Sequence, residues 1–167
     1  IDKLHREEKR WFSEDQEFAN PLVYGLSGQS TVAPYGLDEW FRQAYDSSPL
    51  GLPVLTGPQL TMLFELHAPQ YEIDSQAERD KLGIPTFENG ATAIDTAAPI
   101  AYTLPSYTRF AGANLLQLNY VVWFPEREPV SPVDLFAGKI DSLIWRVTLD
   151  TTGRVLLYDS VHSCGCY

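Results

Sequence analysis

Two neighbouring segments near the end of the chain alternate apolar and polar residues and are joined by a short turn. Residues 144–150 and 154–161 both have the two-residue period that predicts β-strands. The connection, Thr151-Thr152-Gly153, places glycine where a left-handed backbone is needed, which is typical of a hairpin. Because a hairpin pairs its strands in opposite directions, this region predicts an antiparallel sheet.

A third segment, residues 115–124, carries the same alternation. One of its faces is apolar, and the other carries the polar pair Gln117 and Asn119, which indicates a half-buried strand. The apolar face consists of Leu116, Leu118, Tyr120, Val122 and Phe124. The second half of the chain is therefore expected to be rich in strands.

The first half of the chain carries helical signals. Apolar residues recur at helical spacing at Leu37, Trp40, Phe41 and Ala44. Capping boxes begin at Ser13 and Ser75 and predict two further short helices, the second of which ends near Gly83. Residues 60–66 form an apolar segment that fits a strand as well as a helix.

The order of these signals predicts an α+β fold, with short N-terminal helices and a mainly antiparallel C-terminal β-sheet that ends in a β-hairpin. The chain has 167 residues, a common length for a single domain. We expect one domain over residues 1–167, with a helical part over about residues 1–83 and a β-rich part over about residues 84–167.

The charge balance argues against one class of partner. The chain has 12 Lys and Arg against 22 Asp and Glu, a formal net charge of −10 at pH 7. Such a chain repels the phosphate backbone, so no nucleic-acid partner is expected. No apolar run approaches the roughly 18 to 20 residues that cross a bilayer, so no membrane span is expected either.

The most concentrated chemical signal is the C-terminal run His162-Ser163-Cys164-Gly165-Cys166-Tyr167. If the strand before it stays extended, His162, Cys164 and Cys166 point to one face. Neighbours on one face lie roughly 6.5 to 7 Å apart, too far to share a metal ion without a bend, which Gly165 can supply. The three residues therefore form a candidate site for Zn or Cu(I).

Other interpretations of the two cysteines stay open. They can be ordinary cysteines without chemistry, since a free cysteine behaves as a small apolar residue. A Cys164 thiolate, activated by His162 or by His67, can act as a nucleophile or in a redox pair. A disulfide between Cys164 and Cys166 is the remaining alternative, and its small strained ring favours a labile bond.

Two arginines lie among aromatic residues. Arg109 lies between Tyr107 and Phe110, and Arg146 follows Trp145 directly. A guanidinium group binds a carboxylate or a phosphate through two parallel hydrogen bonds, so both arginines are candidates for holding an anionic ligand. The alternative is that each arginine covers apolar surface with its stem and faces solvent.

Two functions follow from these features. One is an enzyme that carries out a metal-assisted or thiolate-dependent reaction, hydrolytic or redox, on the face that carries His162, Cys164 and Cys166. The other is a non-catalytic binding or assembly module with structural cysteines, which binds a protein partner or a small anionic ligand.

The sequence does not fix the cellular compartment, although the content of 9 Tyr and 12 Pro weakly favours an exported protein. The start at Ile1 rather than Met suggests a trimmed product.

Overall fold

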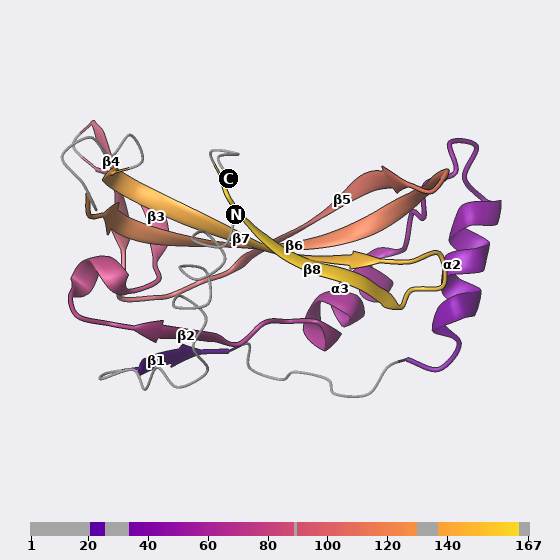
Figure 1. The fold of residues 1–167 in the computed structure, drawn as a ribbon, viewed down its shortest axis with the longest axis horizontal. Helices are drawn as coiled ribbons and strands as arrows, with labels where there is room; N and C mark the ends of the chain where they lie inside the picture. Colours follow the sequence, from indigo (N-terminus) through magenta and orange to yellow (C-terminus); the bar gives the residue numbers. More distant parts are fainter. Residues whose placement is uncertain (1–20, 26–33, 89, 130–136, 164–167) are drawn as a thin grey trace, which may run out of the picture.

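A four-stranded antiparallel sheet forms the middle of the fold (Figure 1). The computed structural model describes residues 21–25, 34–88, 90–129 and 137–163. The strands follow one another in space as they do in the chain, in the order β5 (Tyr102–Phe110), β6 (Ala113–Arg127), β7 (Gly138–Leu149) and β8 (Val155–His162). The predicted antiparallel sheet in the C-terminal part is therefore confirmed.

Left-handed backbone conformations close two of its turns. β5 and β6 are joined by Ala111 and Gly112, whose φ angles are 49° and 85°. Between β7 and β8, Gly153 has a φ of 82°. The Asp150 carboxylate stabilises this turn by accepting the backbone N–H groups of Thr152 at 2.8 Å and Arg154 at 3.0 Å. The predicted hairpin is confirmed, including the place of its glycine.

Among the described residues, the α-helices α2 (Leu37–Asp46) and α3 (Gly57–Leu66) precede the sheet. α2 contains the four apolar residues whose spacing predicted a helix. α3 includes the ambiguous residues 60–66, which are therefore helical. It begins at Thr56, whose backbone N–H donates to the Gln59 side chain at 2.9 Å in the manner of a capping box. No helix in the described part of the chain is long and apolar enough to cross a bilayer.

The first of two short strand pairs corrects the prediction that the part before residue 84 is helical, whereas the second lies in the part that was predicted to be β-rich. β1 (Pro21–Tyr24) precedes α2 and pairs antiparallel with β2 (Tyr71–Asp74), and β3 (Ile84–Glu88) pairs with β4 (Ala91–Asp95). The helix predicted after Ser75 is only a single 3₁₀ turn, η1 (Glu78–Asp80). The α+β class is confirmed, but the described residues before residue 84 contain the strands β1 and β2 as well as helices. The helix predicted at Ser13 lies outside the described residues.

The two helices cover one face of the four-stranded sheet. Phe41 of α2 and Leu63 of α3 are fully buried against it. The sheet contributes Leu116, Leu118, Tyr120, Val147 and Leu149 to this core. Figure 1 shows α3 beneath the middle of the sheet and α2 at one end. The apolar face predicted for residues 115–124 is thus the face that packs against the helices.

The opposite face of the sheet carries a network of paired polar side chains. The Asn119 amide, in a residue only 6% exposed, donates to the Leu104 carbonyl at 3.0 Å and to the Ser106 hydroxyl at 2.9 Å. Gln117 donates to the Thr148 hydroxyl at 3.1 Å. Gln117 and Asn119 are therefore less exposed to solvent than the sequence pattern indicated, because side chains and carbonyls of the neighbouring strands are their hydrogen-bond partners.

Candidate functional site

The strand that leads to the C-terminal motif ends at His162, and Ser163 lies in a turn. Cys164 and Cys166 lie outside the described residues, so the metal site, the thiolate and the disulfide that involve them stay predictions. On the neighbouring strand β7, Leu143 lies opposite His162, and Trp145 lies opposite Ser160. Within the described ranges, no three His, Cys, Asp or Glu side chains are grouped to hold a metal ion.

The His162 ring lies between a carboxylate and a guanidinium group. Its Nδ1 lies 3.3 Å from Oδ1 of Asp141, and its Nε2 lies 3.4 Å from Nη1 of Arg127. In a neutral imidazole with its proton on Nδ1, the Nδ1–H group donates a hydrogen bond to Asp141, and the guanidinium of Arg127 donates to the lone pair on Nε2. The nitrogen that would bind a metal ion or take up a proton therefore already faces a hydrogen-bond donor.

The second histidine of the predicted site lies elsewhere. His67 is the C-terminal cap of α3, and its Nε2 is buried without a hydrogen-bond partner. Burial lowers the pKa of this imidazole below its ordinary value. No hydrogen bond in the described part of the molecule joins His67 to His162, so the structure does not assemble the two into one constellation.

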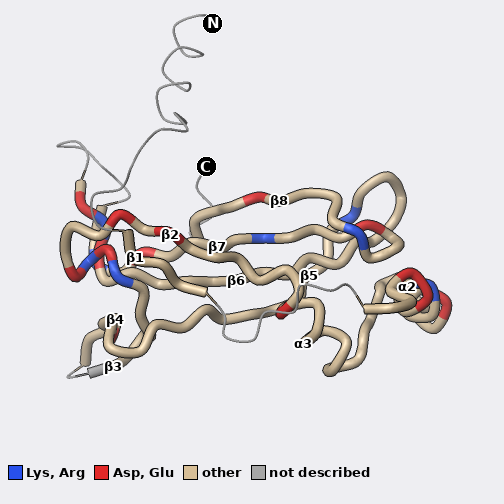
Figure 2. Tube along the Cα trace, turned by 90° about the horizontal axis from the view of Figure 1, so that it is seen from below, with Lys and Arg blue, Asp and Glu red and all other residues tan. Residues whose placement is uncertain are grey.

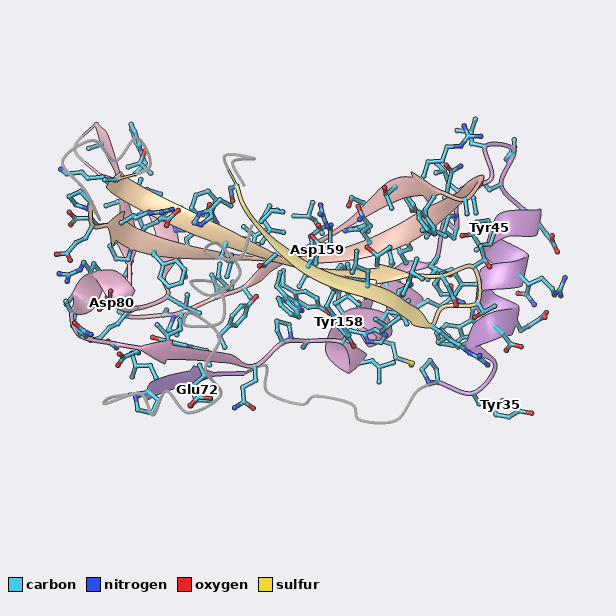
Figure 3. The ribbon with its side chains drawn as sticks, viewed as in Figure 1. Tyr35, Tyr45, Glu72, Asp80, Tyr158 and Asp159 are labelled. Carbon is cyan, nitrogen blue, oxygen red and sulfur yellow. The ribbon has the colours of Figure 1, made fainter. Side chains whose placement is uncertain are left out.

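The two predicted anion-binding arginines lie on opposite faces of the sheet. Arg109 pairs in register with Asn114, whereas Arg146 pairs with Asn119, and these two asparagines point to opposite sides of β6. Arg146 binds the Asp159 carboxylate through Nε at 3.1 Å and Nη2 at 2.5 Å. Figure 3 shows Asp159 and Tyr158 on opposite sides of β8. The guanidinium fork of Arg146 is thus engaged within the sheet.

A pocket lies between the β1–β2 pair and the face of the four-stranded sheet that the helices also cover. Its volume is ≈ 290 Å³. Tyrosines from three strands line it: Tyr24 of β1, Tyr71 of β2 and Tyr120 of β6. The remaining lining residues are Val23, Gly25, Pro69, Leu82, Pro99, Ile100 and Ala101. No described residue of the lining carries a charge.

The hydroxyl groups of Tyr120 and Tyr71 differ in their partners. Tyr120 donates to the backbone carbonyl of Phe64 at 2.8 Å, and its ring meets the Phe64 ring edge-on with centroids 5.4 Å apart. The Tyr71 hydroxyl is buried and has no hydrogen-bond partner. Burial raises the pKa of both phenols above the ordinary value, so both stay protonated at neutral pH and remain donors.

Unpartnered polar atoms gather in the chain segment that forms this side of the pocket. Nε2 of His67, the hydroxyl of Tyr71 and Oδ1 of Asp74 are the buried side-chain atoms that lack a partner in the described ranges. Leaving such an atom unpaired costs about 1–3 kcal/mol. All three lie in the eight residues from the end of α3 to the end of β2. This segment is therefore the part of the molecule whose polar groups remain to be satisfied.

The charged residues gather elsewhere. Figure 2 shows most of them at the two ends of the molecule, on α2 and around η1. A second hollow, of ≈ 420 Å³, lies at the η1 end and contains five carboxylates and two arginines. There Arg79 pairs with Glu128 at 3.0 Å. The tyrosine pocket is thus distinct from the charged surface in its chemistry.

Sequence reasoning missed the tyrosine pocket. The alternation of β6 placed Tyr120 on the buried face, but nothing in the sequence indicated that Tyr24 and Tyr71 would meet it. The two are more than 40 residues apart, and α2 and α3 lie between them in the chain. No protein family model matches the chain, and neither a curated protein nor a solved structure matches it.

Proposed function

We propose that the chain is a non-catalytic binding module and that the tyrosine-lined pocket holds its ligand. The observation that carries this proposal is a pocket with apolar walls that tyrosines from three separate strands line. Binding sites for small molecules are mostly apolar concavities in which a few polar groups fix the orientation of the ligand. A volume of ≈ 290 Å³ lies just below the range for such sites, about 300–1,000 Å³.

The walls support a preformed site. They come from β1, β2, β6 and the segment before β5, and the β1–β2 pair is held in register over all four of its residue pairs. Tyr120 is fixed by its hydrogen bond to Phe64. Because separate elements hold the tyrosines, a ligand does not have to organise the pocket on binding, which lowers the entropic cost.

Filling the pocket with a side chain tests the proposal. Ala101 lines the pocket and is half-buried, whereas Ala98 is exposed and does not line it. We expect Ala101→Phe to abolish the binding of fragments that the unchanged chain binds in a saturation-transfer NMR screen. The library should contain neutral, anionic and cationic one-ring compounds. Ala98→Phe should retain every one of these signals.

Two results would contradict the proposal. One is a screen in which no fragment binds the unchanged chain. The other is a set of fragments that bind Ala101→Phe as well as they bind the unchanged chain. Circular dichroism and thermal unfolding of both variants establish that each has folded before it is screened.

A second candidate function is the thiolate or metal chemistry of the C-terminal motif. Its described member is His162, whose Nδ1 lies 3.3 Å from Asp141. The Arg127 guanidinium beside Nε2 would have to move before that nitrogen could bind a metal ion. It predicts stoichiometric Zn or Cu in the purified protein, or a cysteine thiol with a depressed pKa. Elemental analysis combined with thiol counting tests both, and a metal-free protein with two unreactive thiols would exclude it. Replacing Cys164 and Cys166 by Ser should leave fragment binding unchanged.

A further inference from the structure

Arg109 differs from several other basic residues of the chain in having no acidic partner. Carboxylates form ion pairs with Arg42, Arg79, Lys81 and Arg146. No hydrogen bond or ion pair engages Arg109 in the described part of the molecule, where its side chain is exposed near the end of β5. In a chain with a net charge of −10, its guanidinium group is available to an anion.

Arg109 lines a hollow at the end of the molecule that also carries α2 (Figure 1). The volume of ≈ 550 Å³ lies within the range for small-molecule sites, about 300–1,000 Å³. Separate parts of the fold form its other walls, among them α2 with Tyr45, the following loop with Leu50, the β5–β6 turn with Gly112 and the β7–β8 turn with Thr151. No described lining residue is acidic, so Arg109 gives the hollow a positive charge.

Hydrogen bonds between distant segments hold these walls together. The Asn114 amide donates to the backbone carbonyls of Leu50 at 3.1 Å and Gly51 at 3.2 Å. The Tyr45 hydroxyl donates to the Asn114 carbonyl at 2.6 Å. Burial and the charge of Asp150 raise the pKa of this hydroxyl, so it stays protonated at neutral pH. The hollow therefore exists before a ligand arrives, which lowers the entropic cost of binding.

The negative charge of Asp150 is directed into its own turn. Its Oδ1 accepts hydrogen bonds from the N–H group and the hydroxyl of Thr152 and from the N–H group of Arg154. These donors offset the charge of the carboxylate, and Asp150 is not among the residues that line the hollow. An anion beside Arg109 is therefore repelled less than an unpaired carboxylate at this place would repel it.

The lining also determines the class of anion. One guanidinium group forms two parallel hydrogen bonds to a carboxylate and balances its single charge. The Tyr45 ring and the side chains of Leu50 and Ala113 offer apolar contacts beside it. We propose that this hollow is a second binding site, for a monocarboxylate whose charged end binds Arg109 and whose aromatic body packs against Tyr45 and Leu50.

Four probes test the parts of this proposal at pH 7 and low ionic strength. 2-Naphthoate has a carboxylate and an aromatic body, 2-naphthalenemethanol has a neutral hydroxyl in place of the carboxylate, and acetate and inorganic phosphate have no aromatic body. Dissociation constants come from NMR titrations. We expect 2-naphthoate to bind about fivefold more tightly than the alcohol and at least about tenfold more tightly than acetate or phosphate.

Substitution of the arginine tests its role. Arg109→Gln should weaken 2-naphthoate binding about fivefold and leave the alcohol unaffected, because only the carboxylate uses the guanidinium group. Arg109→Lys keeps the charge without the two parallel donors, so its effect should lie between. Arg154→Gln is the matched control, since Arg154 is exposed just before β8 and does not line the hollow. It should change neither affinity.

Each outcome supports or overturns the proposal. Equal affinities for 2-naphthoate and the alcohol, or equal losses in Arg109→Gln and Arg154→Gln, would overturn the role of Arg109. Acetate or phosphate that binds as tightly as 2-naphthoate would overturn the aromatic carboxylate class.

The variant Ala101→Phe separates this site from the tyrosine-lined pocket. It should leave 2-naphthoate binding unchanged, and a loss would place this probe in the other pocket and overturn the second site. A fragment whose binding Ala101→Phe abolishes belongs to the tyrosine-lined pocket. A carboxylate that Ala101→Phe spares and Arg109→Gln weakens belongs to the hollow, so either site can fail its test while the other passes.

Discussion

The same face of the four-stranded sheet is covered in two different ways. Under α2 and α3, Phe41 and Leu63 are fully buried, and the hydroxyl of Tyr45 donates to the Asn114 carbonyl at 2.6 Å. Under the β1–β2 pair there is a pocket of ≈ 290 Å³, and the buried hydroxyl of Tyr71 in β2 has no partner among the described residues. One part of the face is closed and hydrogen-bonded, and the other is left partly open.

The difference lies in how many side chains each cover presents. α2 and α3 have ten residues each, and a helix directs about three or four residues of every two turns towards a sheet. β1 and β2 have four residues each, and only every second residue of a strand points to one side. Short strands therefore fill less of the space above the sheet than helices do, and a cavity follows.

The largest expected effect comes from emptying the closed part. Phe41→Ala should lower the free energy of unfolding by about 3–5 kcal/mol, because it leaves a cavity that the packed helices cannot fill. Ile100→Ala, at a pocket-lining residue that is 41% exposed, should cost less than about 1 kcal/mol. Urea unfolding followed by circular dichroism measures both. Similar losses for the two variants would show that the two parts are equally well packed.

Crowding the closed part should have the next largest effect. Gly153 has a positive φ, and a Cβ there would lie 2.7 Å from Cε2 of Phe41. Gly36 also has a positive φ, but a Cβ there would meet nothing within 4 Å. Gly36→Ala should therefore cost about 1 kcal/mol for its backbone alone, and Gly153→Ala about 1–3 kcal/mol more. The difference between the two urea midpoints isolates the contacts of that Cβ with Phe41 and with Leu37, whose Cγ would lie 2.8 Å away.

Two tyrosine hydroxyls compare the two covers directly: that of Tyr120 bonds to α3, and that of Tyr71 lies in the β1–β2 pair without a partner among the described residues. Tyr120→Phe should cost about 1 kcal/mol, because it leaves the Phe64 carbonyl without its donor. Tyr71→Phe should be neutral or stabilising by up to about 1 kcal/mol, because it removes a buried hydroxyl that has no partner. Thermal unfolding of both variants without ligand gives the comparison. A loss in Tyr71→Phe as large as in Tyr120→Phe would mean that this hydroxyl is satisfied.

The smallest expected effect is a pH dependence that His67 causes. Burial lowers the pKa of its imidazole in the folded chain, so below the ordinary value of about 6.5 the unfolded chain takes up a proton first. The free energy of unfolding should therefore fall as the pH drops from 7.5 to 5.5, and His67→Gln should reduce this fall. One full pKa unit is worth about 1.4 kcal/mol, and partial exposure makes the effect smaller. An identical pH dependence in both chains would rule out this contribution.

Part of the fold could be read from the sequence because it rests on local patterns. The alternation in β6 placed Leu118 and Tyr120 on the buried face, and Gly153 marked the turn between β7 and β8. The ambiguity over residues 60–66 was also local. It was resolved by the Thr56 cap, which lies just before that segment.

The partner of Arg146 shows where local reasoning ends. Leu149 pairs with Val155, so counting back from the turn one residue at a time would place Arg146 opposite Tyr158. A register shift between Thr148 and Leu149 moves Arg146 opposite Asp159 instead, and the two form an ion pair at 2.5 Å. The sequence contained both charges but did not show that they meet, and the prediction of an anion-binding arginine missed the carboxylate across the strand.

By itself the sequence determined the antiparallel C-terminal sheet, its buried face, the hairpin turn and the helical spacing of α2, because the periods of strands and helices are properties of neighbouring residues. Only the tertiary structure decided that β1 would pair with β2 across both helices and bring Tyr24, Tyr71 and Tyr120 around one pocket. Such a pocket depends on how much of the sheet the short strands cover. It also depends on which buried tyrosine hydroxyl lies close enough to a backbone carbonyl to form a hydrogen bond. Both depend on contacts between residues far apart in the chain.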